Sequence, residues 1–248
     1  MINRMYIILF AFLISVNLIH AQPYQQDIIS TKNGELKITF VKHASLVFEF
    51  QGKTIHVDPV LRMGDYSQLP KADLILITHH HGDHMDLSAI EKIQQKHTRI
   101  IATEKCREIS EFLDQAEIMN DHEEQNILDL KIRSVPAYNI QHKRDNGNPF
   151  HPKGEGNGYI LTFGNKNVYV AGDTENTPEM KALKDIDVAF LPMNLPYTMT
   201  PEMVADAAKA FQPAILYPYH FGKTDTQTLV TLLKGEKIDV RIRNMGFR

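Results

Sequence analysis

The sequence predicts a mixed α/β protein in which two β-sheets pack together and helices cover their outer sides. Strand-like runs with turn signals open both halves of the 248-residue chain, and alternating strand and helix patterns close both halves. No linker, internal repeat or low-complexity tract separates the halves, so a single folded domain is expected. The composition, with 43% apolar and 23% charged residues, supplies a sizeable core.

In the first half, three short strands are separated by turn dipeptides at 33–34 (Asn-Gly) and 51–52 (Gln-Gly). The run at 73–78 is apolar between its polar ends and predicts a buried strand, and Asp86 is the expected N-cap of the following helix. The expected strands are 36–41, 46–50, 54–57, 73–78, 99–102 and 127–135, and the expected helices are 87–95 and 104–113.

In the second half, residues 138–158 contain Pro, Gly, Asn and His without periodicity, which predicts a long loop. A hairpin around 164–165 (Gly-Asn) follows, and Thr200 is the expected N-cap of the next long helix. The expected strands are 159–163, 168–171, 187–191, 214–217 and 240–243, and the expected helices are 201–211 and 226–234.

Residues 1–21 have the pattern of a signal peptide, with Arg4 before an apolar stretch and Ala21 at the expected cleavage point. The bulky Ile19 leaves an uncleaved N-terminal anchor as the alternative. The domain is therefore expected to comprise residues 22–248, exported to a bacterial periplasm or secreted, with no stable membrane insertion after cleavage. The single cysteine, Cys106, permits no intrachain disulfide, which favours a bacterial envelope protein over a disulfide-stapled secreted domain.

The formal net charge of −3 gives no reason to expect nucleic acid or an anionic membrane surface as partner. The compositional oddity is the 12 histidines, several of which cluster.

The cluster is the run at 78–84 (Thr-His-His-His-Gly-Asp-His), directly after the expected buried strand. Imidazole and carboxylate groups are ligands for zinc and similar divalent ions. His79 and His81 are two residues apart and point the same way if the backbone is still extended. Asp83 and His84 follow the turn and can face a second ion. One short loop is thus predicted to serve two neighbouring metals, and a solvated His-rich loop is the alternative.

The pattern His-x-His-x-Asp-His after an apolar strand resembles the signature of the metallo-β-lactamase superfamily. Four further segments resemble other parts of that family, namely 43–45 (His-Ala-Ser), 57–59 (Val-Asp-Pro), 170–174 (Val-Ala-Gly-Asp-Thr) and 217–222 (Tyr-Pro-Tyr-His-Phe-Gly). The resemblance covers nearly the whole expected domain and implies a four-layer αββα sandwich. The opening His-Ala and the closing Pro-x-His are most similar to the branch of ascorbate-6-phosphate lactonase and N-acyl-phosphatidylethanolamine phospholipase D.

The resemblance implies a ligand set for one or two divalent ions, most often zinc, with manganese or iron as alternatives. The implied ligands are His79 and His81 for the first ion, Asp83, His84 and His220 for the second, and Asp173 as a bridge. The sequence departs from the family at Asn139, where the third histidine of the first site is expected. His151 and His142 are the candidate replacements, and His151 is favoured because Pro152 restricts it to an extended backbone. The alternative is that neither binds.

Two such ions would lower the pKa of a shared water to about 7 and so supply hydroxide for attack on a carbonyl or phosphorus. The resemblance therefore implies a metal-dependent hydrolase of a small ester, lactone or phosphodiester. Asp83 and His220 are expected to assist the reaction, and Tyr197 to contact the substrate. The alternatives are a metal-binding protein without hydrolysis, with a first site impaired at Asn139, and a β-lactamase.

Two further expectations concern the surroundings of the metals. His43 and Asp58 are expected beside the ligands, with Asp58 either holding the Nδ1–H of a ligand histidine or simply starting a turn. Lys153, with glycines at 154, 156 and 158, is a candidate for bringing positive charge and backbone amides to an anionic substrate, and a flexible loop is the alternative.

Overall fold

The computed structural model describes residues 24–246, which form two β-sheets of seven strands each. The first sheet contains β1 to β7 in sequence order, and the second contains β8 to β14 in sequence order. Each sheet starts antiparallel and ends parallel, with the change at β4 in the first sheet and at β11 in the second. The expected signal peptide at 1–21 lies outside the described residues.

The bounds of the elements follow the chain. The first sheet contains β1 (Gln25–Thr31), β2 (Gly34–Lys42), β3 (Ser45–Phe50), β4 (Lys53–Val57), β5 (Leu74–Leu76), β6 (Arg99–Ala102) and β7 (Glu117–Ile118). The second contains β8 (Glu124–Ile127), β9 (Leu130–Ala137), β10 (Gly156–Phe163), β11 (Lys166–Val170), β12 (Val188–Pro192), β13 (Ile215–Tyr219) and β14 (Asp239–Val240). The α-helices are α1 (Leu87–Ile93), α2 (Glu104–Ile109), α3 (Pro178–Lys181), α4 (Pro201–Phe211) and α5 (Thr226–Leu232).

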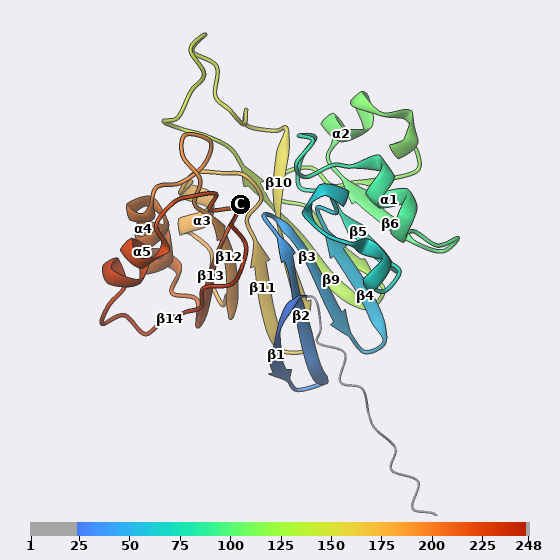
Figure 1. Ribbon diagram of the computed structural model, residues 1–248, viewed down its shortest axis with the longest axis horizontal. Coiled ribbons are helices and arrows are strands. Elements are labelled where there is room, and N and C mark those ends of the chain that lie inside the picture. The colour runs from blue at the N-terminus through green and yellow to red at the C-terminus, as the bar shows by residue number, and fades with distance from the viewer. Residues whose placement is uncertain (1–23, 247–248) are drawn as a thin grey trace, which may run out of the picture.

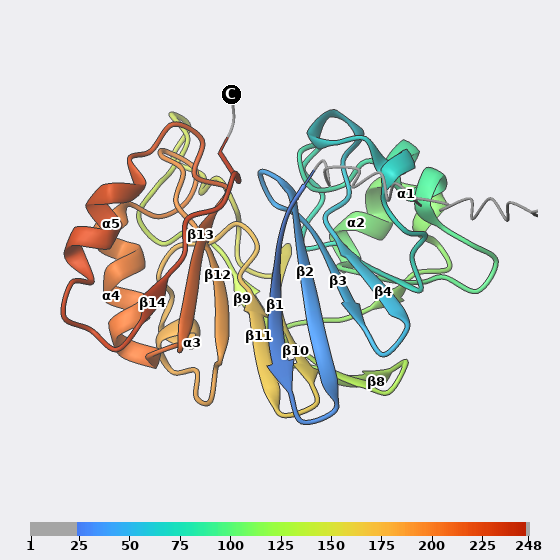
Figure 2. The ribbon, with the colours of Figure 1, turned by 60° about the horizontal axis from the view of Figure 1, so that its bottom comes forward.

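Three separate apolar cores mark four layers, as the resemblance implied. The first core lies between the sheets, where Phe48 of β3 meets Phe190 of β12 with ring centroids 5.9 Å apart. The second joins the outer face of the second sheet to α4 and α5, and the third joins the outer face of the first sheet to α1 and α2. Figures 1 and 2 show α1 and α2 on one side of the paired sheets and α3 to α5 on the other.

The expectation of one strand at 127–135 was wrong, because the chain turns at Leu128 and Asp129 and forms a hairpin between β8 and β9. Both residues have positive φ, 53° and 63°, which is the conformation of a two-residue hairpin turn. Neither is glycine, so the usual turn signal was missing. The edge strand β1, the two-residue β7 and the short α3 were not expected, and the helix expected at 104–113 ends at Ile109, where Glu111–Leu113 continues as a 3₁₀ turn.

The parallel parts of the two sheets position the polar loops. Strands β4, β5, β11, β12 and β13 run in parallel within their sheets, so the loops after their carboxyl ends gather at the same edge of each sheet. Backbone hydrogen bonds join the sheets there, from the His220 amide to the His43 carbonyl and from the Asn157 amide to the Thr78 carbonyl, both at 2.9 Å. Within residues 24–246, no helix is long and apolar enough to cross a membrane.

Candidate metal centre

The histidine run lies in the loop between β5 and α1, as predicted. The amides of His84 and Met85 both donate to the carbonyl of His81, at 2.9 and 2.8 Å, and close a tight turn. Asp86 then caps α1 by accepting hydrogen bonds from the amides of Ser88 and Ala89. The loop is thereby fixed at both ends, and His79 and His84 are buried while His81 and Asp83 are half-buried.

Three histidines form the first ligand group, because single ring nitrogens of His79, His81 and His151 lie within 4.8 Å of one another. Nε2 of His79 lies 3.2 Å from Nδ1 of His81. The ring centroid of His151 lies 5.1 Å from that of His79 and 4.9 Å from that of His81. The loop after β9 therefore brings to this group the histidine that the sequence favoured.

Asn139 occupies the family's expected histidine position and holds His151 instead. Its Oδ1 accepts hydrogen bonds from both the amide and the Nδ1 of His151, each at 2.8 Å. A proton on Nδ1 leaves Nε2 of His151 facing Asp173, at 3.4 Å from Oδ2. His142, the other candidate, turns away, with Nδ1 at 2.7 Å from the buried carboxylate of Glu175. Of the alternatives left open by the sequence, the geometry favours His151.

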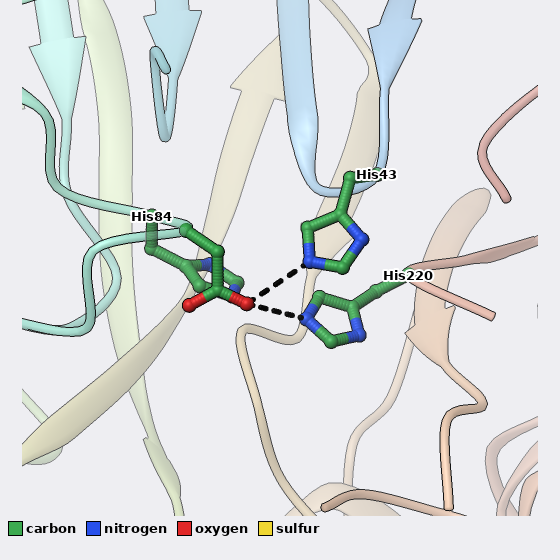
Figure 3. Close-up of side chains that lie close together, drawn as sticks. His43, His84 and His220 are labelled. Atoms are coloured by element: carbon green, nitrogen blue, oxygen red, sulfur yellow. Dashed lines mark hydrogen bonds and ion pairs between the residues drawn. The ribbon is translucent and has the colours of Figure 1, made fainter. Parts of the chain in front are cut away.

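The second ligand group contains His43, Asp83, His84 and His220, again with one ligand atom of each residue within 4.8 Å of the others. Figure 3 shows the three histidines converging from separate segments of the chain. Asp83 Oδ2 lies 3.1 Å from Nε2 of His43 and 3.6 Å from Nε2 of His220. The rings of His43 and His220 are close, with centroids 3.7 Å apart.

Asp173, directly after β11, lies between the two groups. One carboxylate oxygen is 3.4 Å from Nε2 of His84, and the other is 3.3 Å from Nε2 of His220 and 3.4 Å from Nε2 of His151. Asp173 also forms a third ligand group with His79 and His84. This is the position expected of a bridging ligand.

Asp58 supports the loop from beneath, beyond its possible role as a turn residue. Its buried carboxylate accepts hydrogen bonds from the amide and hydroxyl of Thr78, at 2.8 and 2.7 Å, and lies 2.7 Å from Nδ1 of His84. This contact places the proton of His84 on Nδ1 and turns Nε2 toward Asp173, as a carboxylate behind a ligand histidine does. The expectation for Asp58 therefore agrees with the geometry.

Three residues at the site have strained backbones. His43, Asp58 and His220 have φ of 58°, 45° and 48°, a region that residues other than glycine seldom adopt. Such strain persists only where the surrounding structure enforces it, and it is common at functional sites. Each of the three follows the end of a strand, so the strain aims its side chain back over the edge of the sheets.

Burial and charge set the protonation of the cluster. Burial lowers the pKa of His79 well below its usual value and lowers that of His151 to about 4, so both rings are neutral at pH 7. Burial opposes ionisation of Asp173, but the histidines His220 and His84 outweigh it and hold its pKa well below the usual range. Burial disfavours protonation of His84, but the neighbouring carboxylates, Asp173 first among them, raise its pKa well above the usual value. Neutral imidazole and ionised carboxylate are the forms that bind metal, so binding of an ion would release the extra proton of His84.

The donor set fits divalent ions. Nε2 of His84, Nε2 of His220 and Oδ1 of Asp173 are buried and have no hydrogen-bond partner among residues 24–246. Buried polar atoms without partners are costly and need an explanation. Lone pairs of nitrogen and carboxylate oxygen that face a common point are suited to zinc or a similar cation. His80, which is not among the ligands that the resemblance implies, belongs to none of the three groups.

The ligands form the floor of a cleft of about 330 Å³. Its described lining residues are His81, Gly82, Asp83, Arg144, Phe150, His151, Asp173, Asn194, Tyr197 and His220. Tyr197 is 46% exposed and packs edge-to-face on Phe150 with ring centroids 5.1 Å apart, so it reaches the cleft as expected. Such a volume lies at the lower end of small-molecule sites.

Sequence reasoning placed one cation wrongly and missed another. Lys153 does not line the cleft, because its ammonium group pairs with Glu179 at 2.7 Å and lies over the ring of Tyr138. Gly158 serves the packing of strands, since a Cβ there would lie 2.7 Å from the carbonyl of Ala171. Arg144, which no sequence pattern had selected, lines the cleft instead.

Sequence reasoning also understated His43, which was expected only beside the ligands. The structure includes it in the second group, in contact with Asp83. Its position in the turn between β2 and β3 hides this role, because only the crossing of the two sheets brings that turn to His220.

Comparisons with known proteins show the family to which the chain belongs. A family described as the β-lactamase superfamily domain matches residues 37–220. A curated metal-dependent hydrolase of Koribacter versatilis is 34% identical over 203 residues, covering 75% of this chain and 84% of the relative. A curated metal-dependent hydrolase of Methanopyrus kandleri is 30% identical over 205 residues, with the same two coverages.

Two solved structures are similar in fold and sequence. A crystal structure of a metal-dependent hydrolase from Parabacteroides distasonis is 49% identical, with a TM-score of 0.84 over 90% of this chain and 99% of that chain. A metallo hydrolase from the archaeon Ignicoccus hospitalis is 26% identical, with a TM-score of 0.68 over 86% of this chain and 96% of that chain.

Proposed function

This chain belongs to the β-lactamase superfamily and is a metal-dependent hydrolase, and on that premise we propose that it hydrolyses a small ester, lactone or phosphodiester. The superfamily expected from the motifs is thereby confirmed. The narrower likeness to ascorbate-6-phosphate lactonase and N-acyl-phosphatidylethanolamine phospholipase D stays a prediction.

One observation carries the proposal, namely that Asp173 lies between two groups of ligand side chains at the floor of the cleft. In the proposed site the first divalent ion is held by His79, His81 and His151. The second is held by Asp83, His84 and His220, with His43 steadying Asp83 through its 3.1 Å contact. Zinc suits this set best, and manganese and iron are the other candidates.

Ions held in this way lower the pKa of a bound water and stabilise charge that develops on the attacked group. The protein side chains supply the rest. Asp83 and His220 both line the cleft, so a leaving group held there is within their reach, and they are the proposed partners for its proton. Tyr197 contributes a hydroxyl and a ring at the exposed side, where the substrate enters.

The two alternatives from the sequence receive less support. A metal-binding protein without hydrolysis was suggested by Asn139, but Asn139 holds His151 in the first group rather than leaving that group incomplete. A β-lactamase activity is tested directly by nitrocefin hydrolysis, and we expect none. We further propose that residues 22–248 form the exported domain, which cell fractionation and N-terminal sequencing of the purified protein will test.

The decisive test replaces Asp173 with alanine. We expect Asp173→Ala to lose at least one of two metal equivalents and nearly all hydrolysis of bis-p-nitrophenyl phosphate or a p-nitrophenyl ester. Asp206→Ala is the matched control, because Asp206 lies on the outer helix α4 and pairs with Lys181 away from the cleft. Circular dichroism checks that both variants fold. Full metal content and activity in folded Asp173→Ala protein would overturn the assignment.

A further inference from the structure

Arg144 is the only arginine or lysine among the described residues that line the metal cleft. The other charged residues of the lining are Asp83 and Asp173, which the proposed site assigns to metal binding. Arginine stays protonated at all physiological pH values. The wall of the cleft therefore has a permanent positive charge, separate from the charge of the metal ligands and any ions at its floor.

The loop that presents Arg144 is a small, closed hairpin. Lys143 and Pro149 form an isolated β-bridge, and the Arg144 amide donates to the carbonyl of Asn148 at 2.7 Å. The amide of Gly147 in turn donates to the carbonyl of Arg144 at 2.9 Å. These bonds fix the backbone from which the side chain leaves.

The guanidinium group itself is positioned but not neutralised. Nη2 donates to the carbonyl of Phe150 at 3.2 Å, and the guanidinium carbon lies 5.0 Å from the centre of the Phe150 ring. Among residues 24–246, no carboxylate lies within ion-pair distance of it. By contrast, Arg99 and Arg243 pair closely with Glu117 and Asp27. Four of the five N–H donors of Arg144 thus have no acceptor among the described residues.

We infer that Arg144 binds an anionic oxygen group of the substrate, a carboxylate or a phosphate, at a distance from the bond that is hydrolysed. The inference rests on the proposed function and narrows it to small esters, lactones or phosphodiesters that carry this additional negative charge. The planar guanidinium group can donate hydrogen bonds to two oxygens at once. Phe150 and Tyr197 form an aromatic wall beside the guanidinium group of Arg144. They contact the part of the substrate that lies between its anionic group and the bond that is hydrolysed.

If Arg144 served only to hold its own loop against Phe150, a different result would be expected. Arg144→Gln keeps an N–H donor for the Phe150 carbonyl and removes the charge, so a structural role would tolerate it. Lys143→Gln removes a charge from the neighbouring residue, whose side chain is exposed and does not line the cleft. Together the two variants separate a local charge effect in the cleft from a general effect of net charge.

The kinetic arm compares p-nitrophenyl acetate with mono-p-nitrophenyl succinate, which differ by a carboxymethyl group and so by one negative charge. We expect Arg144→Gln to lower kcat/KM for the succinate ester by about 10- to 100-fold, the usual size for a hydrogen bond to a charged group, mainly through KM. The acetate ester should be unaffected, and Lys143→Gln should change neither. An unchanged succinate-to-acetate ratio in Arg144→Gln would overturn the inference while leaving hydrolysis itself established.

The binding arm does not depend on turnover. Isothermal titration of the zinc-loaded protein with acetate, succinate and 3-phosphonopropionate measures whether a second anionic group adds affinity. We expect the two dianions to bind at least tenfold more tightly than acetate in the wild type and Lys143→Gln, and not in Arg144→Gln. The stronger of the two dianions identifies carboxylate or phosphate as the preferred group. If the dianions bind through Arg144 but no ester is hydrolysed, the anion site stands and the proposed hydrolysis of such esters is wrong. If all three anions bind equally well, the anion site is wrong.

Discussion

Asn139→Ala tests how this chain replaces the missing histidine of its first metal site. The asparagine is only 7% exposed, and its side chain makes four hydrogen bonds. It accepts from the amide and the ring of His151, and it donates to the Tyr197 carbonyl at 2.9 Å and to Glu175 at 3.2 Å. Alanine removes all four contacts and leaves the His151 ring with no partner to fix its tautomer.

The size of the effect follows from these contacts. Losing the residue that orients a ligand histidine typically weakens metal binding by about 10- to 100-fold. We expect this loss of affinity for only one of the two ions, because His151 belongs to only one of the three ligand groups, the first. The Nδ1–H of His151 and the carbonyl of Tyr197 also lose buried partners, so we expect a destabilisation on the order of 3 kcal/mol.

Competition with a chromophoric chelator will measure the two dissociation constants, and urea unfolding of the metal-free protein will measure stability. His142→Gln is the matched control, because His142 lies in the same loop but faces Glu175, and we expect it to keep both ions. His151→Gln should lose the ion that Asn139→Ala weakens. If His142→Gln loses an ion and His151→Gln does not, the assignment of the third ligand is wrong.

Two further substitutions address the support beneath the site and the core beside it. Asp58→Asn keeps the shape and the left-handed backbone but removes the negative charge next to Nδ1 of His84, so we expect metal affinity at the second site to fall about 10- to 100-fold, as measured by the same competition. His56 is fully buried and burial lowers its pKa from 6.5 to about 4, so its protonation disfavours the fold. The contribution of neutral His56 to the free energy of unfolding is fully present above about pH 6.5 and is lost as the pH falls toward 4. The loss is about 3 kcal/mol, because each pKa unit corresponds to about 1.36 kcal/mol. In urea unfolding of metal-free protein between pH 7 and 4, His56→Gln should therefore lose less stability than the wild type by about that amount, and parallel pH profiles would contradict this reasoning.

The sequence alone determined the elements with strong periodicity or clear caps. Residues 99–102 and 201–211 were predicted to their ends, because an apolar strand and a helix capped by Thr200 are specified by their own residues. Elements that depend on partners were not predicted. Strand β1 is mostly exposed and is strand only because it pairs with β2, and the turn at Leu128 and Asp129 adopts positive φ without a glycine.

The histidine run at 78–84 by itself predicted a metal site with two ligand directions, since both follow from residue type and spacing within one loop. The resemblance pointed to the distant ligands Asp173 and His220. Residue type and spacing did not reveal that His43 joins the second ligand group, that Asn139 holds His151, or that Arg144 lines the cleft.

The packing of one sheet on the other decided the role of His43, because it brings turns far apart in the sequence within hydrogen-bond distance, as His43 and His220 show. A side chain that faces a site across the domain leaves no periodic trace in the sequence around it. For this reason the metal-binding loop could be predicted from the sequence. The hydrogen bonds by which Asn139 orients His151, and the positive charge that Arg144 brings to the cleft, were seen only in the tertiary structure.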